Sequence, residues 1–455
     1  MMTGLAIAIG IYLVMLLGVS FWTSTQVKSS EDFIVAGRRL PVSLATFTLL
    51  ATWFGAGTLL TATDEIFDKG LSVTALEPYG AGACLILAGL FFAKPLWEMR
   101  LCTFSDFYRL KFGARAEKLS VLLTIPGYVG WVAVQLIALG GILNLFFNIP
   151  VWIAILAVAT VSMIFTIIGG MWSVTITDSI QLLLVFAGLI TLGYEVFKQL
   201  GDHPLAEIDP GRLILIPREN LSEFMSWTGV FLVSALGNIP GQDLGQRIFA
   251  SRSSQTAAYS CLLAGLLYIA LGSIPVFLGI VAPLVLNPQI ESSIIPALAR
   301  AFLSPAMTVL FVLSLISVVL STITSAILAP ATTVAHNYLN HRFPHASPLR
   351  ICHYCVAGVT IASVLVAFSG EETYFLLEAA YAVGLVCFFP PLMIGLCFGK
   401  RSEGAMLAGI VVGTLVWIPE FFFESEFPYA LAGCLTNFGV YFLLNGWQRP
   451  RNVES

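Results

Sequence analysis

The sequence has 455 residues, of which 58% are hydrophobic and only 11% are charged, and its formal net charge is −4. Soluble globular domains carry about 25% charged residues, so this balance excludes a soluble protein and indicates a chain that crosses a membrane many times. The polar stretches are too short to hold a soluble catalytic or kinase domain.

Hydrophobic stretches of about 20 residues, long enough to cross a bilayer as helices, recur along the whole chain. We therefore predict an all-α polytopic membrane protein with about thirteen transmembrane helices. The predicted spans lie near residues 3–22, 41–63, 70–96, 119–147, 150–169, 173–197, 225–246, 256–284, 297–338, 351–369, 372–398, 404–423 and 427–446.

Lys and Arg are distributed unevenly between the connections. If the N-terminus lies outside, 17 of the 22 basic residues fall on the cytoplasmic side and five fall outside, with Arg247, Lys400, Arg449 and Arg451 among the cytoplasmic ones. The positive-inside rule then predicts a multi-pass protein of the plasma (cytoplasmic) membrane, with its N-terminus outside and its C-terminus inside.

Two of the predicted spans contain residues that interrupt helices. Gly237-Asn-Ile-Pro240-Gly241 lies within the span at 225–246, and Gly55-Ala-Gly57 lies within the span at 41–63. Backbone that is not helical at membrane depth survives only where protein buries it or where it lines a watery cavity. Glycines in membrane helices also serve close packing, but broken helices in two halves of a chain are typical of the binding site of a secondary transporter.

The spans divide into two sets of five, and each set opens with an interrupted helix. Because each set has an odd number of spans, the second enters the membrane from the opposite face, which predicts an inverted repeat. The predicted units are a peripheral helix and loop (1–40), the first repeat (41–197), an external loop (198–224), the second repeat (225–398), and two peripheral helices with a short tail (399–455).

Four hydroxyl side chains fall within about one and a half turns of the span at 297–338, so several of them share one helix face. These residues are Ser321, Thr322, Thr324 and Ser325. Hydroxyl oxygens are hard ligands that suit a hard cation such as sodium. The alternative is that they bond back to their own helix or join neighbouring helices.

Three carboxylates fall inside or beside the spans. Glu77 lies deep in the third span, where a buried carboxylate must be paired, protonated, or in contact with water or ligand. Asp178 is either a favourable partner of a helix N-terminus or a functional group. Asp243 follows the second break, and we expect it to pair with Arg247, four residues further along a helix.

At these positions the chain resembles the sodium:solute symporter family, most closely its high-affinity choline transporter-like branch. The residues that carry the family resemblance are Gly169-Gly-Met-Trp-Ser-Val-Thr-Ile-Thr177-Asp178-Ser-Ile-Gln181, Gln246-Arg247-Ile-Phe-Ala-Ser251 and Leu320-Ser321-Thr322-Ile-Thr324-Ser325. The branch is indicated by Ala51-Thr-Trp53-Phe54-Gly55-Ala-Gly57, Leu90-Phe-Phe-Ala-Lys-Pro95 and Gly237-Asn-Ile-Pro240.

The resemblance implies a sodium-driven symporter with a LeuT-type 5+5 inverted repeat, one extra N-terminal helix and two extra C-terminal helices. It implies a first sodium site at the carbonyls of Ala51, Phe54 and Val318 and the hydroxyls of Ser321 and Thr322. It also implies a second sodium site at Asp178, Ser321, Thr324 and Ser325, so that one or two sodium ions are expected per cycle.

The solute site departs from the choline branch. Two rings of the branch's aromatic cage are matched by Trp53 and Trp131, but Gly241 and Ala81 stand where two more aromatic residues are expected. Each well-placed ring contributes roughly 0.5–2 kcal/mol to the binding of a cation. The expected solute is therefore a small cationic or zwitterionic organic molecule other than choline. The predicted solute-binding residues are Trp53, Thr58, Glu77, Trp131, Asn238 and Gln242.

We predict a sodium-coupled symporter that imports this solute by alternating access, with the lipid bilayer and the solute as its partners. No nucleic acid and no obligatory protein partner are expected. The alternatives are a proton-coupled carrier of the same fold that uses Glu77 or Asp178, and a non-transporting sensor or partner subunit. An enzyme is disfavoured, because the sequence has no zinc-protease motif, no Ser/His/Asp set and no phosphate loop.

Overall fold

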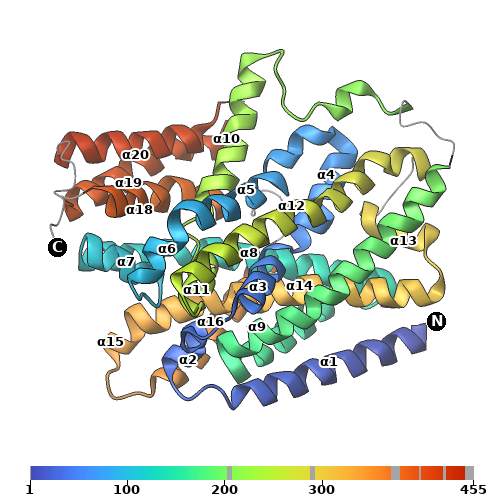
Figure 1. Ribbon diagram of the computed structural model, residues 1–455, viewed down its shortest axis with the longest axis horizontal. Helices are drawn as coiled ribbons and strands as arrows, with labels where there is room; N and C mark the ends of the chain where they lie inside the picture. The colour runs from blue at the N-terminus through green and yellow to red at the C-terminus, as the bar shows by residue number, and fades with distance from the viewer. Residues whose placement is uncertain are drawn as a thin grey trace.

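A computed structural model describes residues 2–201, 207–286, 293–369, 380–398, 401–423 and 427–445 (Figure 1). Within these ranges the chain is helical and has no β-strand; an isolated bridge joins Leu40 to Ser251. Helices satisfy their own backbone hydrogen bonds, which suits a chain in lipid. The start of the predicted span at 372–398 and the basic residues Lys400, Arg449 and Arg451 lie outside the described residues.

The helices have the following bounds in chain order. They are α1 (Met2–Ser24), α2 (Ser30–Val35), α3 (Val42–Trp53), α4 (Ala62–Lys69), α5 (Tyr79–Leu87), α6 (Ala93–Glu98), α7 (Phe104–Lys111), α8 (Ala114–Phe147), α9 (Val151–Leu200), α10 (Leu221–Gly237), α11 (Gln242–Ala250), α12 (Ser254–Val285), α13 (Ile294–Phe302), α14 (Pro305–Val334), α15 (Asn340–Arg342), α16 (Pro348–Ala367), α18 (Phe389–Cys397), α19 (Glu403–Trp417) and α20 (Tyr429–Asn445). Four π-helical segments extend these helices: η2 (Gly57–Thr61), η4 (Ala88–Phe92), η7 (Ala335–Leu339) and η8 (Gly384–Phe388).

Among the described residues, nine helical segments are long and apolar enough to cross a membrane, and a bent pair made of α3 and η2–α4 adds a tenth. The difference from about thirteen predicted spans has identifiable causes. Helix α9 covers both spans predicted at 150–169 and 173–197, with non-helical backbone at Gly170 (φ 48°, ψ −137°) between them. Helices α10 and α20, which cover the spans predicted at 225–246 and 427–446, have only 17 residues each.

The single span predicted at 297–338 is wrong in its N-terminal boundary. The chain forms the short helix α13, which ends at Phe302, and α14 then begins separately at Pro305. Ser304 caps α14 by accepting a hydrogen bond from the Met307 N–H, and proline at the first helical position favours a new start. The hydrophobicity of both helices concealed this boundary.

Helix α14 lies at the centre of the molecule, where it packs against α9, α8, α16 and α3. Helix α1 runs along one side against α9, while α19 and α20 pack on each other and on η8 at the opposite side (Figure 1). Large apolar side chains on α1 and α20 are exposed, such as Ile11, Trp22 and Leu443. This is the pattern expected of helices that face lipid.

Candidate ion and solute sites

The first interrupted helix is buried against α14. Helix α3 ends at Trp53, the chain becomes helical again by Gly57, and the two halves meet at an angle of 58°. The N–H of Ala56 donates to Oε1 of Gln135 on α8 at 2.9 Å. A Cβ atom on Gly55 would lie only 2.8 Å from Oγ1 of Thr322, so glycine allows this close approach. Gly57 belongs to the resumed helix rather than to the break itself.

Four of the five groups predicted to bind the first sodium ion lie together between α3 and α14. The Ser321 hydroxyl lies 3.0 Å from the carbonyl oxygens of both Ala51 and Val318. The Thr322 hydroxyl lies 3.4 Å from the Ala51 oxygen and 3.0 Å from the Val318 oxygen. Phe54, the fifth residue, is fully buried and directly follows the last residue of α3. Such a set of neutral oxygens suits a hard monovalent cation.

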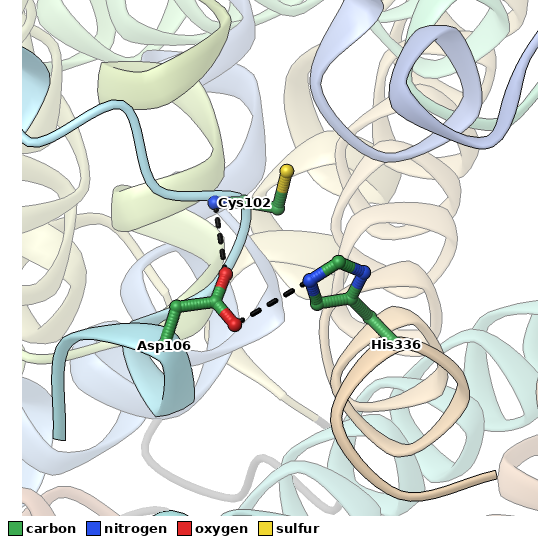
Figure 2. Close-up of side chains that lie close together, drawn as sticks. All are labelled: Cys102, Asp106 and His336. Atoms are coloured by element: carbon green, nitrogen blue, oxygen red, sulfur yellow. Dashed lines mark hydrogen bonds and ion pairs between the residues drawn. The ribbon is translucent and has the colours of Figure 1, made fainter. Parts of the chain in front are cut away.

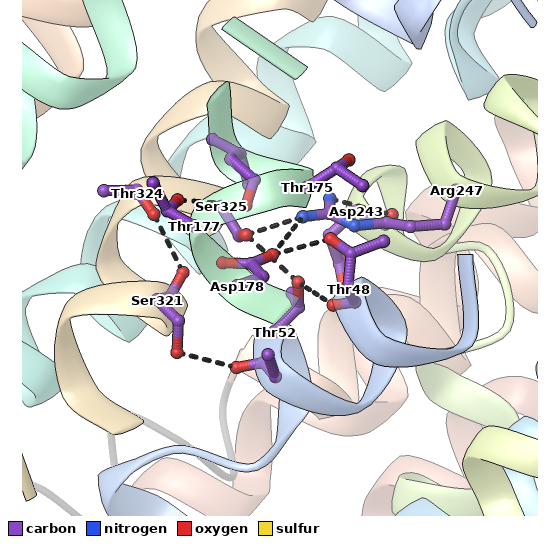
Figure 3. A network of polar contacts seen from close by, with 12 residues as sticks. Thr48, Thr52, Thr175, Thr177, Asp178, Asp243, Arg247, Ser321, Thr324 and Ser325 are labelled. Carbon is purple, nitrogen blue, oxygen red and sulfur yellow. Dashed lines mark hydrogen bonds and ion pairs between the residues drawn. The ribbon is translucent and has the colours of Figure 1, made fainter. Parts of the chain in front are cut away.

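Two residues of the second predicted sodium site, Asp178 and Ser325, contact the side chain of Arg247. The Thr48 hydroxyl donates to Oδ2 of Asp178 at 2.6 Å, and Nη2 of Arg247 lies 3.8 Å from the same oxygen (Figure 3). The same Nη2 donates to Oγ of Ser325 at 2.5 Å. Thr324 instead donates to the Ser321 carbonyl of its own helix at 3.0 Å. The guanidinium of Arg247 therefore lies among residues that the sequence predicts to be ligands of a second sodium ion.

Arg247 is wholly buried, although its charge had been assigned to the cytoplasmic side. Its Nη1 donates to the main-chain oxygen of Asp243 at 3.2 Å. The predicted side-chain pair between Asp243 and Arg247 is thus wrong, because the guanidinium turns to Asp178 on α9 and Ser325 on α14. A spacing of four residues marks neighbours on one helix, but it cannot reveal a carboxylate supplied by another helix.

A pocket lies between α3, α8, the α10–α11 break and η8. Five aromatic residues contribute to its wall, together with the polar groups that follow the second break. These residues are Trp53, Tyr128, Trp131, Tyr381, Phe388, Asn238, Gln242 and Asp243. The break residues Gly237, Pro240 and Gly241 also line the pocket.

Asp243 is the carboxylate of this pocket. The Trp53 indole N–H donates to its Oδ2 at 2.5 Å, and the Tyr128 hydroxyl donates to its Oδ1. The Asp243 N–H donates back to the Tyr128 oxygen at 3.0 Å. The carboxylate is therefore held by two aromatic residues that line the same pocket, and the described lining residues include no side chain of opposite charge.

Of the six predicted solute-binding residues, the structure brings Trp53, Trp131, Asn238 and Gln242 to the pocket. The side-chain nitrogen of Gln242 is buried and has no hydrogen-bond partner in the described part of the chain. Thr58 and Glu77 are not among the lining residues. Tyr381, which lines the pocket, donates to Oε1 of Glu77 at 3.1 Å, and Thr58 donates to Oε2 of the same carboxylate.

The Glu77 carboxylate connects the pocket wall to the first helix break. Its Oε2 accepts hydrogen bonds from Thr58 at 2.9 Å and from Tyr268 at 2.5 Å. The Tyr268 hydroxyl also lies 3.1 Å from the carbonyl oxygen of Trp53, the last residue of α3. Glu77 is thus buried and bonded to three hydroxyl groups, which explains how a mid-membrane carboxylate is tolerated.

The aromatic wall does not depend on the two positions at which sequence comparison expected rings. Ala81 is buried but does not line the pocket, and Gly241 lies beside the Tyr128 hydroxyl. Tyr128 and Trp131, one helical turn apart on α8, have ring centroids separated by 5.8 Å. The spacing of Tyr128 and Trp131 was visible in the sequence, whereas the contribution of Tyr381 required the tertiary structure.

Two glycine backbones touch where the end of α10 meets η8. A Cβ atom on Gly384 would lie 1.9 Å from the Gly237 carbonyl oxygen. We expect Gly384→Ala to push this wall of the pocket apart and to destabilise the protein by about 1–3 kcal/mol or more, as overpacking does. The apparent melting temperature in detergent should fall. Gly358→Ala, on α16 with no atom within 4 Å of its added methyl group, is the matched control and should not lower it.

A cluster of candidate sodium ligands beside one broken helix and a pocket at a second break are typical of a membrane carrier. The chain belongs to the sodium:solute symporter family, because the model of that family matches residues 33–413. This confirms the family predicted from the motifs and the all-α membrane fold. The protein is therefore a sodium-coupled symporter of a small solute and not an enzyme.

Similar proteins agree with this assignment. The human protein named high affinity choline transporter 1 is 26% identical to the chain over 95% of it and 83% of the relative. The sodium/glucose cotransporter of Vibrio parahaemolyticus is 24% identical over 62% of the chain and 56% of the relative.

Solved structures show the same fold. A sodium-coupled sialic acid symporter in its substrate-bound outward-open state superimposes with a TM-score of 0.81 at 17% identity, covering 99% of this chain and 98% of that one. Mhp1, a nucleobase-cation-symport-1 family transporter, superimposes with a TM-score of 0.58 at 17% identity, covering 92% of this chain and 96% of that one.

Proposed function

We propose that the protein imports a small organic cation together with one sodium ion. The observation that carries this proposal is the balance of buried charge. The core around the two breaks holds three buried carboxylates, Glu77, Asp178 and Asp243, but among the described residues only one buried guanidinium, that of Arg247. When all three are ionised, two negative charges lie inside the membrane with hydrogen-bond donors but without a cationic side chain beside them in the described part of the chain, a costly arrangement that two bound cations would offset.

The residues that line the pocket support an organic molecule as one of the two bound cations. Its carboxylate, Asp243, stands among aromatic faces that attract a cation through their quadrupoles. No Lys, Arg or His is present among the described lining residues, so the acidic group of a zwitterion would lack a charged partner. These features favour an amine or an ammonium compound over a zwitterion, an organic acid or a sugar. The names of the choline transporter relatives point in the same direction.

Sodium is the second cation, and we assign one ion to the oxygens of Ala51, Phe54, Val318, Ser321 and Thr322. The other predicted sodium position differs, because the Arg247 guanidinium already pairs there with Asp178 and Ser325. A fixed positive charge at that position supports a stoichiometry of one sodium ion rather than two.

In this mechanism sodium binds first between α3 and α14 and orders the first break. The Trp53 carbonyl and indole then present a completed wall to the solute, and the Glu77–Tyr381 contact transmits the closure to η8. Alternating access releases both ions on the opposite side. With the plasma-membrane orientation predicted from the basic residues, each inward-moving charge gains about 2.3 kcal/mol per 100 mV of inside-negative potential.

Thermal unfolding in sodium or in potassium, with amines, quaternary ammonium compounds, amino acids and neutral analogues, tests the solute class. A ligand that binds only the folded state raises its stability. We expect an organic cation to raise the melting temperature only in sodium. Stabilisation by zwitterions or sugars alone would contradict the proposed class, and a response to pH without any response to sodium would favour a proton-coupled carrier.

The ion site has its own test in the double variant Ser321→Ala with Thr322→Val, which removes two oxygens of the proposed sodium site. We expect the sodium-dependent rise in melting temperature to disappear. Thr333→Val is the matched control, because this buried hydroxyl on the same helix donates to the Ala329 carbonyl of its own helix at 3.0 Å, and its loss should leave the response intact. An unchanged sodium response in the double variant would exclude the site.

The number of ions can be read from flux. Charge movement and solute uptake are measured together in proteoliposomes into which the purified protein has been reconstituted. Transport of one sodium ion with one monovalent organic cation moves about two charges per solute molecule, and a second sodium ion would raise this ratio to about three.

A further inference from the structure

A second group of ligand-type side chains lies apart from the solute pocket, at the end of α14 and the start of α7. Cys102 precedes α7, Asp106 is in its first turn, and His336 lies on η7 (Figure 2). One potential ligand atom from each residue lies within 4.8 Å of the other two. Nε2 of His336 lies 3.4 Å from Oδ1 of Asp106.

These distances fit a metal better than a direct hydrogen bond. Two ligands that bind zinc tetrahedrally at about 2.0–2.1 Å lie roughly 3.3 Å apart, and a nitrogen or oxygen and a sulfur at about 2.3 Å lie roughly 3.5 Å apart. The separation between His336 and Asp106 already has this length. The sulfur of Cys102, which is partly exposed, lies within 4.8 Å of the ligand atoms of the other two residues.

The surrounding groups hold the Asp106 carboxylate in place for this role. Its Oδ2 accepts the N–H groups of Cys102 and Thr103 at 3.0 Å each, which leaves Oδ1 facing His336. Asn337 donates to Oδ1 at 2.7 Å and so fixes its orientation. Such supporting hydrogen bonds are typical of metal ligands. None of these three side chains takes part in the proposed binding of solute and sodium.

We propose that Cys102, Asp106 and His336 bind one Zn²⁺ ion, with water as the fourth ligand. Binding forms three protein–metal bonds, and the thiol proton of Cys102 leaves to solvent. The mixture of sulfur, imidazole nitrogen and carboxylate oxygen is typical of zinc. The Arg38 guanidinium, whose Nη2 lies 3.7 Å from the Cys102 sulfur, would stay beside the thiolate. The ion would link α7 to α14, the helix that carries the proposed sodium ligands.

Cobalt(II) is the spectroscopic probe for this site in the full-length protein, purified in detergent and freed of any histidine tag. A bound thiolate gives Co²⁺ a charge-transfer absorption band, and Zn²⁺ abolishes this band when it displaces cobalt. We expect the band at one equivalent of cobalt in the unaltered protein. Cys102→Ala should eliminate it, and His336→Ala should weaken cobalt affinity at least tenfold. Cys397→Ala, which removes an exposed cysteine elsewhere, should change neither.

A measurement on the unaltered protein keeps the test independent of how the variants fold. Zinc should slow the alkylation of Cys102 at least tenfold, measured by peptide mass spectrometry against Cys397 in the same sample. An unchanged ratio of the two rates would overturn the proposal. So would the absence of a thiolate band at stoichiometric cobalt, or its persistence in Cys102→Ala.

Discussion

Asp243→Asn is expected to abolish high-affinity binding of the organic cation while the fold and the sodium response remain. The amide keeps one oxygen to accept the Trp53 or Tyr128 hydrogen bond, but it removes the only carboxylate among the described residues that line the pocket. Removing one partner of a buried charge pair costs about 2–5 kcal/mol, which corresponds to a loss of affinity on the order of 30-fold to several thousandfold. Solute-dependent thermal shifts and uptake into proteoliposomes measure this loss directly.

Glu420→Gln provides a matched control for the Asp243 variant. Glu420 also accepts a hydrogen bond from a tryptophan indole, that of Trp417 at 3.0 Å, but it lies beyond α19 and outside the pocket. Its replacement should leave the solute affinity unchanged. If Asp243→Asn also retained its affinity for the cation, then the charge of Asp243 would have no part in recognition and the proposed solute class would be wrong.

The helix breaks and the hydroxyl-bearing helix face were predictable because residues close together in the sequence determine them. Glycine and proline mark a broken membrane helix wherever they occur together, and closely spaced hydroxyls on one helix mark a polar face. The breaks near Gly55 and Gly237 and the grouping of Ser321 with Thr322 follow from such patterns. Ala51 joins that group because α3 packs against α14 and brings its carbonyl to the Ser321 hydroxyl, which family resemblance implied but local sequence does not encode.

The features that were missed depend on which helices become neighbours. Arg247 has ordinary spacing from Asp243, and only the packing of α9 and α14 against α11 brings Asp178 and Ser325 within its reach. Glu77 has the position of a pocket residue along its span, but it does not line the pocket, and Tyr381, more than three hundred residues away in sequence, donates a hydrogen bond to it from the pocket wall. Sequence periodicity assigns a side chain to a helix face, whereas the partner of that face is a property of the whole fold.

The buried pair of Asp178 and Arg247 leads to the largest expected effect on stability. Arg247→Met retains much of the side-chain volume but leaves Asp178 without a charged partner, at a position where both side chains are completely buried. Breaking such a pair costs about 3–5 kcal/mol, because the remaining charge stays in a medium of low polarity. The apparent melting temperature should fall strongly. Arg300→Met, which loses an exposed arginine bonded to the Leu145 carbonyl, should cause little change.

The double variant Arg247→Met with Asp178→Asn separates a charge effect from a packing effect. Because it removes both charges, it should recover most of the lost stability.

The single variant Arg247→Met should also be stabilised more by sodium than the unaltered protein is, since an ion can then occupy the place of the guanidinium beside Asp178 and Ser325. Melting temperatures in sodium and in potassium at equal ionic strength measure both effects. If sodium stabilised the single variant no more than the unaltered protein, the guanidinium would not be standing in for a second ion, and the argument for one sodium ion per cycle would fail.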